Sequence, residues 1–219
     1  MPALITWWKL DLAELAPQAH SDAVLAVGAD LLRRWAEPQR RYHTSRHLVE
    51  MFWALEDLEK AGEVGAREGA VGRLAAWFHD AVYEPVAAPG ANETASAELA
   101  VRDLAALGLD GADVDTVRRL VLATETHDLP DRGLAAAFHD ADLWILSAPP
   151  ERYAEYTAQV REEYAAVPDD AFAAGRSALL RPFLDRDFIY ATQAAREQWG
   201  ERARLNLAGE LEALASASP

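Results

Sequence analysis

The sequence predicts an all-α protein, built as one helical bundle of about eight or nine helices. Nearly every segment carries apolar residues at positions i, i+3, i+4 and i+7, the period of an amphipathic helix. No alternating apolar and polar run bounded by turn signals marks a strand. The 219 residues contain no repeat, low-complexity linker or break in composition, so a single domain over residues 1–219 is expected.

Nine segments follow the helical period, and some of them have recognisable ends. Asn92 precedes the segment 93–107 and Gly108 follows it, which predicts an N-cap and a C-terminal glycine. Pro182 is expected to kink or divide the late helices. Residues 81–92 are rich in Pro, Gly and Ala and predict a loop that forms one wall of a pocket. In chain order the expected helices are 21–36, 45–60, 70–80, 93–107, 114–127, 133–147, 150–166, 170–184 and 187–214.

The amino-acid composition limits which metal ligands and which partners the protein can have. The chain has no cysteine, so a bound metal would have imidazole and carboxylate ligands and no thiolate. Its 36 acidic and 21 basic residues give a formal net charge of -15, which disfavours nucleic acid as a partner and favours a small substrate. No secretory signal pattern and no apolar run long enough for a membrane span occur, so a cytoplasmic protein without a membrane partner is expected.

Two histidines lie close together in the segment RYHTSRHLVEMF. His43 and His47 are four residues apart, so both rings fall on one face if the helix begins early enough. That spacing can chelate a metal ion. A surface or capping pair of histidines is the alternative.

A His-Asp pair ends the expected helix 70–80. Leu74 and Phe78 belong to its apolar stripe, His79 lies at the edge of that stripe, and Asp80 closes the last turn. Because a carboxylate at a helix C-terminus opposes the macrodipole, Asp80 requires a compensating cation, which a metal would supply. The alternative is that Asp80 caps the following turn.

A second aspartate falls on an apolar face in the segment GLAAAFHDADLWIL. On a helical wheel Leu134, Phe138 and Ile145 form one arc that includes Asp142, whereas Asp140 points largely away. Burying an unpaired carboxylate among apolar side chains is costly. Asp142 is therefore expected to bind a metal or, alternatively, an arginine.

Together His47, the adjacent His79-Asp80 pair and the distant Asp142 resemble the signature of the HD superfamily of metal-dependent phosphohydrolases. Further segments resemble one bacterial branch of predicted HD phosphohydrolases, over roughly residues 30–210: RYHTSRH, AAWFHDAVYEP, NETASAELA, the helix ending in THD, DADL, VPDDAFAAGR and ARLNL. The resemblance implies an HD-type fold with a metal-binding core over about residues 40–147 and C-terminal helices, 150–214, packed on it.

The resemblance makes His47, His79, Asp80 and Asp142 the metal ligands. Imidazole and carboxylate ligands suit Mn, Fe, Ni, Co, Zn or Mg, and an open site can bind both water and a phosphate oxygen. The metal would activate the attacking water, and Asp80 would hold or deprotonate it as a catalytic residue.

Two further histidines raise the question of a second metal. Some members of the superfamily use extra histidines between the His-Asp pair and the final Asp, and His127 and His139 lie in that interval. His127 is the better candidate, because His139 takes a place where the branch usually has an apolar residue. His43 and His127 serve equally well as catalytic proton donors or as phosphate contacts, so their roles stay open.

Arginine supplies 19 of the 21 basic residues, and its planar fork matches phosphate oxygens. The candidate substrate contacts are Arg46, Arg176 in the segment VPDDAFAAGR and Arg204 in ARLNL. Glu84, in the loop 81–92, is a candidate acid or partner of a ligand.

The sequence thus predicts an enzyme, a metal-dependent phosphohydrolase that cleaves a phosphate ester in a small molecule such as a nucleotide. One divalent metal ion or two would be its cofactor. Two alternatives stay open: a non-catalytic HD protein that binds a metal or ligand, and a di-iron HD-fold oxygenase in which His127 or His139 holds a second iron. The expected partner is a small phosphorylated substrate, and the oligomeric state, a homodimer included, is left open.

Overall fold

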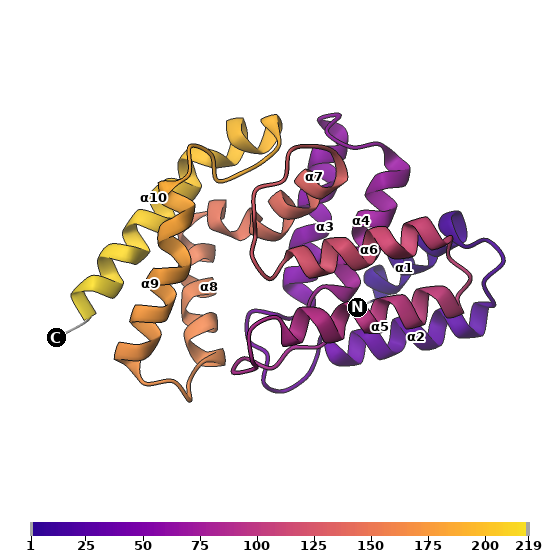
Figure 1. The fold of residues 1–219 in the computed structure, drawn as a ribbon, viewed down its shortest axis with the longest axis horizontal. Helices are drawn as coiled ribbons and strands as arrows, with labels where there is room; N and C mark the ends of the chain where they lie inside the picture. Colours follow the sequence, from indigo (N-terminus) through magenta and orange to yellow (C-terminus); the bar gives the residue numbers. More distant parts are fainter. Residues whose placement is uncertain (1, 218–219) are drawn as a thin grey trace.

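The computed structural model describes residues 2–217, which form ten α-helices and one short 3₁₀ helix, η1 (Figure 1). No strand occurs in this range, so the prediction of an all-α fold is confirmed. In chain order the elements are α1 Pro2–Leu15, α2 Ser21–Arg34, α3 Ser45–Lys60, α4 Ala66–Phe78, α5 Ala91–Ala106, α6 Gly111–Ala123, α7 Gly133–Asp142, η1 Leu143–Ser147, α8 Pro150–Glu163, α9 Asp169–Asp185 and α10 Gln193–Ala217.

The expected count of eight or nine helices is too low, because α1 was not predicted. Its segment PALITWWKLDLAEL is apolar around most of its circumference and so lacks a clear amphipathic period. Trp8 and Leu12 are fully buried, and the Trp8 indole N–H donates to the carbonyl of Val24 at 2.7 Å. The segment predicted as one helix over 133–147 consists of α7 followed directly by η1.

Several helix ends also differ from the prediction. Gly90, with φ of 72°, is the N-cap of α5, and the predicted cap Asn92 lies inside the helix. The Asn92 amide instead makes two hydrogen bonds to the backbone of Glu84, at 3.1 and 3.0 Å. Gly108 follows α5 with φ of 80°, as predicted for a C-terminal glycine. Helix α9 continues through Pro182, so this proline does not divide it.

Two hydrophobic clusters form the interior, and α3 and α7 contribute to both. The first gathers side chains mainly from α1 to α6, including the fully buried Trp35 and Trp77. The second joins η1 with α8, α9 and α10. In Figure 1 the last three helices lie at one end of the molecule and α1, α2, α5 and α6 at the other, with α3 and α7 between them.

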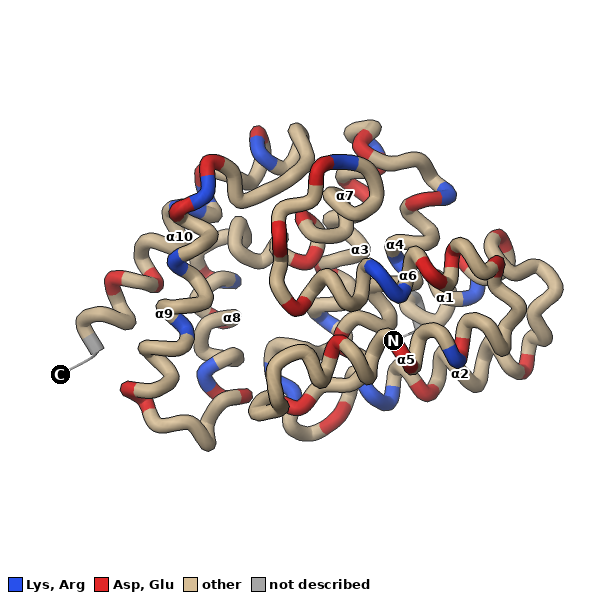
Figure 2. The backbone as a smooth tube through the Cα atoms, viewed as in Figure 1, with Lys and Arg blue, Asp and Glu red and all other residues tan. Residues whose placement is uncertain are grey.

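Charged residues are distributed over most helices (Figure 2). Basic residues are scattered among acidic ones in this view and form no long stripe along a single helix. Within residues 2–217, no helix combines the length and apolar character that crossing a bilayer requires.

Asp140, predicted to point largely away from the core, is fully buried, so that prediction was wrong. Its carboxylate accepts hydrogen bonds at 2.7 Å from the backbone N–H groups of Ala191 and Thr192 and from the Thr192 hydroxyl. It also accepts one at 2.9 Å from His139 Nδ1. These bonds hold residues 186–192 as a connecting segment, and α10 begins at Gln193 instead of the predicted 187.

Asp140→Asn should destabilise the protein by about 2 to 4 kcal/mol, because an amide N–H₂ would face a backbone N–H that now donates to a carboxylate. Urea unfolding measured with a chelator present would test this without a contribution from bound metal. Asp57→Asn, at an exposed position on α3, is the matched control and should shift stability by less than about 0.5 kcal/mol. Equal stability of the two variants would contradict the role given to Asp140.

Candidate metal centre

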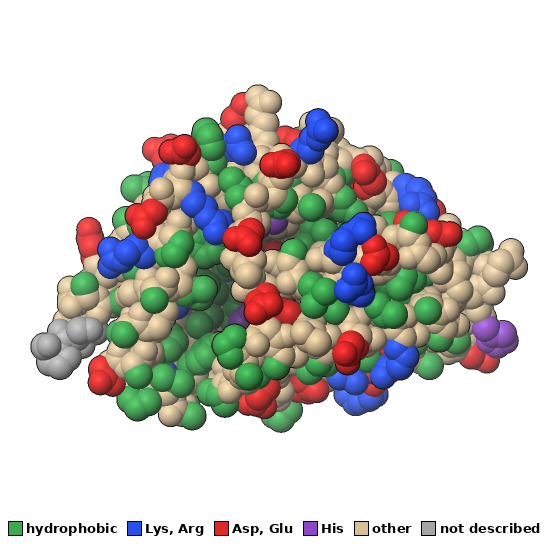
Figure 3. Space-filling model, viewed as in Figure 1, with side chains coloured by type: hydrophobic (Ala, Val, Ile, Leu, Met, Phe, Trp, Pro, Cys, Tyr) green, Lys and Arg blue, Asp and Glu red, His purple; other side chains and the backbone are tan. Residues whose placement is uncertain are grey.

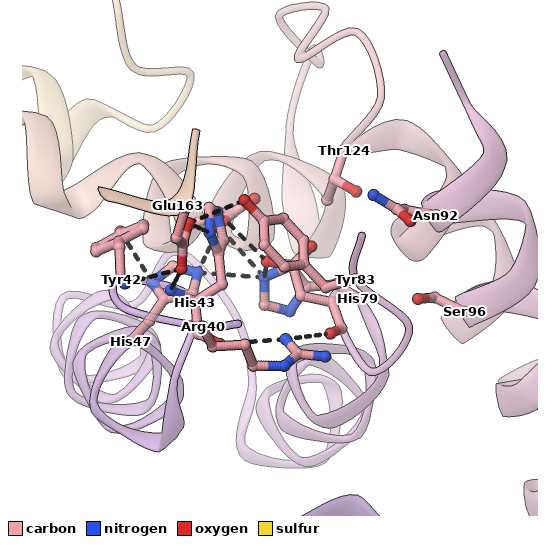
Figure 4. A network of polar contacts seen from close by, with 12 residues as sticks. Arg40, Tyr42, His43, His47, His79, Tyr83, Asn92, Ser96, Thr124 and Glu163 are labelled. Atoms are coloured by element: carbon pink, nitrogen blue, oxygen red, sulfur yellow. Dashed lines mark hydrogen bonds and ion pairs between the residues drawn. The ribbon is translucent and has the colours of Figure 1, made fainter. Parts of the chain in front are cut away.

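Three side chains predicted as metal ligands meet between α3 and the end of α4. Potential ligand atoms of His47, His79 and Asp80 all lie within 4.8 Å of one another. Nε2 of His47 lies 3.2 Å from Nε2 of His79, which lies 3.0 Å from Oδ2 of Asp80. His79 is the C-cap of α4 and Asp80 the next residue, so the helix end directs both toward α3. Figure 4 shows the rings of His47 and His79 pointing toward each other.

The fourth predicted ligand, Asp142, joins this group from the last residue of α7. Its Oδ1 lies 3.1 Å from Nε2 of His47 and 3.6 Å from Nε2 of His79. Residues from three helices, separated by up to 95 positions in the chain, therefore surround one small volume.

Hydrogen bonds on the far side of each ring fix the imidazoles. Nδ1 of His79 lies 2.9 Å from the carbonyl of Ala76, and because a carbonyl only accepts, Nδ1 must donate. Nδ1 of His47 lies 3.0 Å from the Tyr42 hydroxyl. Both rings thereby direct Nε2 at the shared volume. When neither Nε2 carries a proton, as metal binding requires, the two lone pairs 3.2 Å apart repel unless a cation lies between them. The donor set fits a divalent metal.

The protonation of the group shows the same need for positive charge. Burial alone lowers the pKa of His79, but the carboxylates of Asp80 and Asp142 outweigh it and raise the pKa to about 9. Burial raises the pKa of each carboxyl, yet the neighbouring imidazoles outweigh burial and lower both values well below the usual range. In the absence of a metal, a proton on His79 provides positive charge beside the two carboxylates.

His43 reaches the group from outside helix α3. The helix begins at Ser45 after its N-cap Thr44, so His43 and His47 do not share a helical face as the sequence suggested. The His43 ring nevertheless points to the site, with Nε2 3.9 Å from Oδ2 of Asp80. Its face lies against the Tyr83 ring at a centroid distance of 4.2 Å (Figure 4).

Glu163, at the end of α8, is a functional candidate that the sequence analysis missed. One carboxylate oxygen accepts the backbone N–H groups of residues 41 to 43 at 2.6, 2.9 and 3.0 Å. The other lies 2.6 Å from Nδ1 of His43 and accepts the Tyr83 hydroxyl at 2.9 Å. Burial raises the pKa of Glu163, but these hydrogen bonds outweigh it and lower the value to about 2. An acid at a helix C-terminus was the sequence signal available, the same signal that identified Asp80.

Arg40 is a second residue that the sequence did not indicate, and it connects two segments of the site. Its guanidinium is fully buried and donates to the carbonyls of Asp80 at 2.8 Å and His43 at 3.1 Å (Figure 4). It thereby holds the segment before α3 against the segment after α4. No sequence pattern distinguished Arg40 from the other arginines.

His127 and His139 occupy different environments. His127 follows α6 with φ of 47°, a left-handed conformation that costs about 1 kcal/mol or more in a non-glycine residue. Its Nε2 lies 3.9 Å from Oδ2 of Asp142, and its ring lines the cavity described below. His139 does not line that cavity: Nδ1 binds Asp140, and Nε2 is buried without a hydrogen-bond partner among the described residues.

The predicted substrate contacts are mostly placed elsewhere. Arg46 is half-exposed and pairs with Glu50 and Glu155 outside the cavity. Arg204 donates to carbonyls at the end of α9, and Glu84 is exposed outside the cavity. The structure thus does not bring these three side chains to the cavity, because sequence does not show which surface a side chain faces. Arg176 does line the cavity.

A cavity of about 560 Å³ opens beside the metal-binding group. One end is lined by the histidines and aspartates of the group, with Tyr83 and Asn92 from the loop predicted as a pocket wall. Helices α8 and α9 line the other end with mainly apolar side chains. Figure 3 shows a hollow in this face of the molecule with hydrophobic side chains around and inside it.

Comparison with known proteins adds no family to this geometry: no protein-family model and no curated protein sequence matches the chain. The resemblance to the HD superfamily therefore remains a prediction from the motifs.

Binding of Co²⁺ at pH 7.5 should release about one proton per metal ion, because His79 with a pKa near 9 is protonated in the metal-free protein. The affinity for Co²⁺ should weaken as the pH falls below the pKa of His79, since protons compete with the metal for Nε2 of that ring. Isothermal titration calorimetry in two buffers of different ionisation enthalpy measures the released proton.

His20→Ala is the matched control, because His20 is exposed at the N-cap of α2. This variant should keep both binding and proton release, whereas His79→Ala should lose binding. Metal binding without proton release at pH 7.5 would rule out the proposed protonation of the site.

Proposed function

We propose that this protein is a metal-dependent hydrolase of phosphate esters, with the phosphate bound at the polar end of the cavity. The observation that carries the proposal is the convergence of two imidazole Nε2 atoms and two largely buried carboxylates on a cavity large enough for a small molecule. The HD-like order of these residues in the sequence, His47, His79-Asp80 and Asp142, supports the same reaction.

The four residues would hold a divalent ion, which when bound lowers the pKa of a water molecule and neutralises charge on a phosphoryl group. His47 and His79 are already oriented for this by the hydrogen bonds on their Nδ1 atoms. The Asp80 carboxylate, next to both His79 and His43, can accept the proton of the attacking water.

His43 is the proposed proton donor to the leaving group. Glu163, ionised because of its low pKa, holds one proton on His43 Nδ1, so the donated proton would be the one carried by Nε2 of the doubly protonated ring, which is directed at the site beside Asp80. This carboxylate, imidazole and reacting-group order is typical of an oriented general acid or base. Glu163 acts through His43 and is a positioning residue in this scheme.

Metal-loaded protein should hydrolyse p-nitrophenyl phosphate, and Asp80→Ala should abolish turnover while circular dichroism shows unchanged helicity. Asp57→Ala, exposed on α3, should retain full activity. Both variants would be assayed after reconstitution with Mn²⁺, Co²⁺ or Zn²⁺. Stoichiometric metal with no turnover on any phosphate ester would contradict the hydrolase proposal and favour a non-catalytic metal- or ligand-binding protein.

Glu163→Gln should lower kcat about 100-fold for a simple alkyl phosphate, whose leaving group needs a proton, but less than about threefold for p-nitrophenyl phosphate, whose leaving group does not. Glu162→Gln is the matched control, because Glu162 precedes Glu163 in the chain and its own carboxylate is exposed and pairs with Arg41. An equal loss for both substrates would show that Glu163 acts only through folding of the site.

A further inference from the structure

An apolar arm of the cavity lies between η1, α8 and α9, and it begins next to the metal-binding group, where the rings of Phe183 and His127 lie 6.3 Å apart. Six side chains define it: Leu146, Val160, Phe172, Leu179, Leu180 and Phe183. Near the turn between α8 and α9 the rings of Tyr164 and Phe172 lie 6.1 Å apart, and both line the cavity. The arm is therefore continuous with the polar end but differs from it in chemistry.

Part of this apolar surface is exposed to solvent. The Leu179 side chain has a relative exposure of 55%, and Phe172 and Tyr164 are only half-buried. All three side chains line the cavity. Hydrophobic side chains are visible in the hollow of Figure 3. An apolar ligand would remove this surface from water.

Few side chains that line the cavity could bind a polyanionic or strongly polar substituent. Arg176 is the one arginine or lysine among the described residues that line it. Its guanidinium is already paired, with Nε donating to Glu210 at 2.8 Å and Nη2 donating to the Tyr156 hydroxyl at 2.6 Å. Glu93 and Glu125 add further acidic groups to the lining beside the two aspartates. A polyphosphate would thus meet carboxylates without a free cation other than the metal.

Hydrogen-bonding groups for the edge of a nucleobase are also scarce in the arm. The six side chains that define it are all hydrocarbon. The Tyr156 hydroxyl, close to them, is committed to Arg176. A site that recognises a base needs several placed donors and acceptors, whereas an aliphatic chain needs only apolar area.

We infer that the substrate is a phosphate ester of a hydrophobic alcohol, with its phosphate at the metal-binding group and its aliphatic chain in the apolar arm. The inference rests on the proposed function for the reaction, but the binding of the chain is tested without turnover. It replaces the nucleotide expected from the sequence with an amphiphilic substrate.

The test uses methyl-, hexyl- and decylphosphonic acid, whose carbon–phosphorus bond is not hydrolysed, with Co²⁺-loaded protein. Calorimetry should show affinity rising about two- to fourfold per added methylene until the arm is filled. The methylenephosphonate analogue of adenosine 5′-monophosphate, which is likewise not hydrolysed, should bind more weakly than decylphosphonic acid. Affinity independent of chain length, or tighter binding of the nucleotide, would overturn the inference.

Leu179→Gln should weaken decylphosphonic acid binding about three- to tenfold and leave methylphosphonic acid binding unchanged, because only the long chain reaches α9. The matched control is Leu205→Gln, which alters a leucine of similar exposure on α10 outside the cavity. Equal affinities of both variants for the long chain would overturn the placement of the arm. Chain-length-dependent binding without hydrolysis of any phosphate ester would support the ligand class while refuting the proposed reaction.

Discussion

The centre of this structure depends on one electrostatic constraint: the carboxylates of Asp80 and Asp142 are largely removed from water, so each needs positive charge close by. Among the described residues, their ion-pair partners are all histidines: His43, His47, His79 and His127. An arginine there would neutralise a carboxylate permanently. An imidazolium instead gives up its proton when a metal ion binds its nitrogen, so His79 can exchange a proton for a metal ion.

Hydrophobic packing provides the stability that offsets the desolvation of this polar group. Helix α4 is buried along almost its whole length, and Leu74, Trp77 and Phe78 have no measurable exposure. Because packing fixes the end of α4 on all sides, the positions of His79 and Asp80 are fixed with it. Arg40 and Glu163 then attach the less regular segments through backbone groups, whose positions vary less than those of side chains. The rigid core thus determines where a metal could bind.

The sequence predicted the parts of the centre that a local pattern encodes, and missed those that depend on distant contacts. Helical periodicity gave the all-α fold, and polar residues on apolar faces pointed to His79 and Asp142. Helix α1 was missed because it is apolar on most sides, and Asp140 was misjudged because the Ala191–Thr192 backbone that binds it lies some fifty residues away. Glu163 and Arg40 were missed for the same reason. Their partners lie about 120 and 40 positions away in the chain, so no local sequence pattern indicates their role.

The two ends of the cavity come from different parts of the chain, and under the proposed function this division would separate reaction from substrate selection. Residues 40 to 142 supply every candidate metal ligand, whereas η1, α8 and α9 supply the apolar arm and, through Glu163, one support for the polar end. A net charge of -15 surrounds a site with no free arginine or lysine among its described lining residues. Under the proposed function, electrostatic attraction of an anionic substrate would therefore be weak away from the metal, and apolar contact would provide much of the binding free energy. Selectivity in such a site depends on the shape and length of the hydrophobic group more than on its charge.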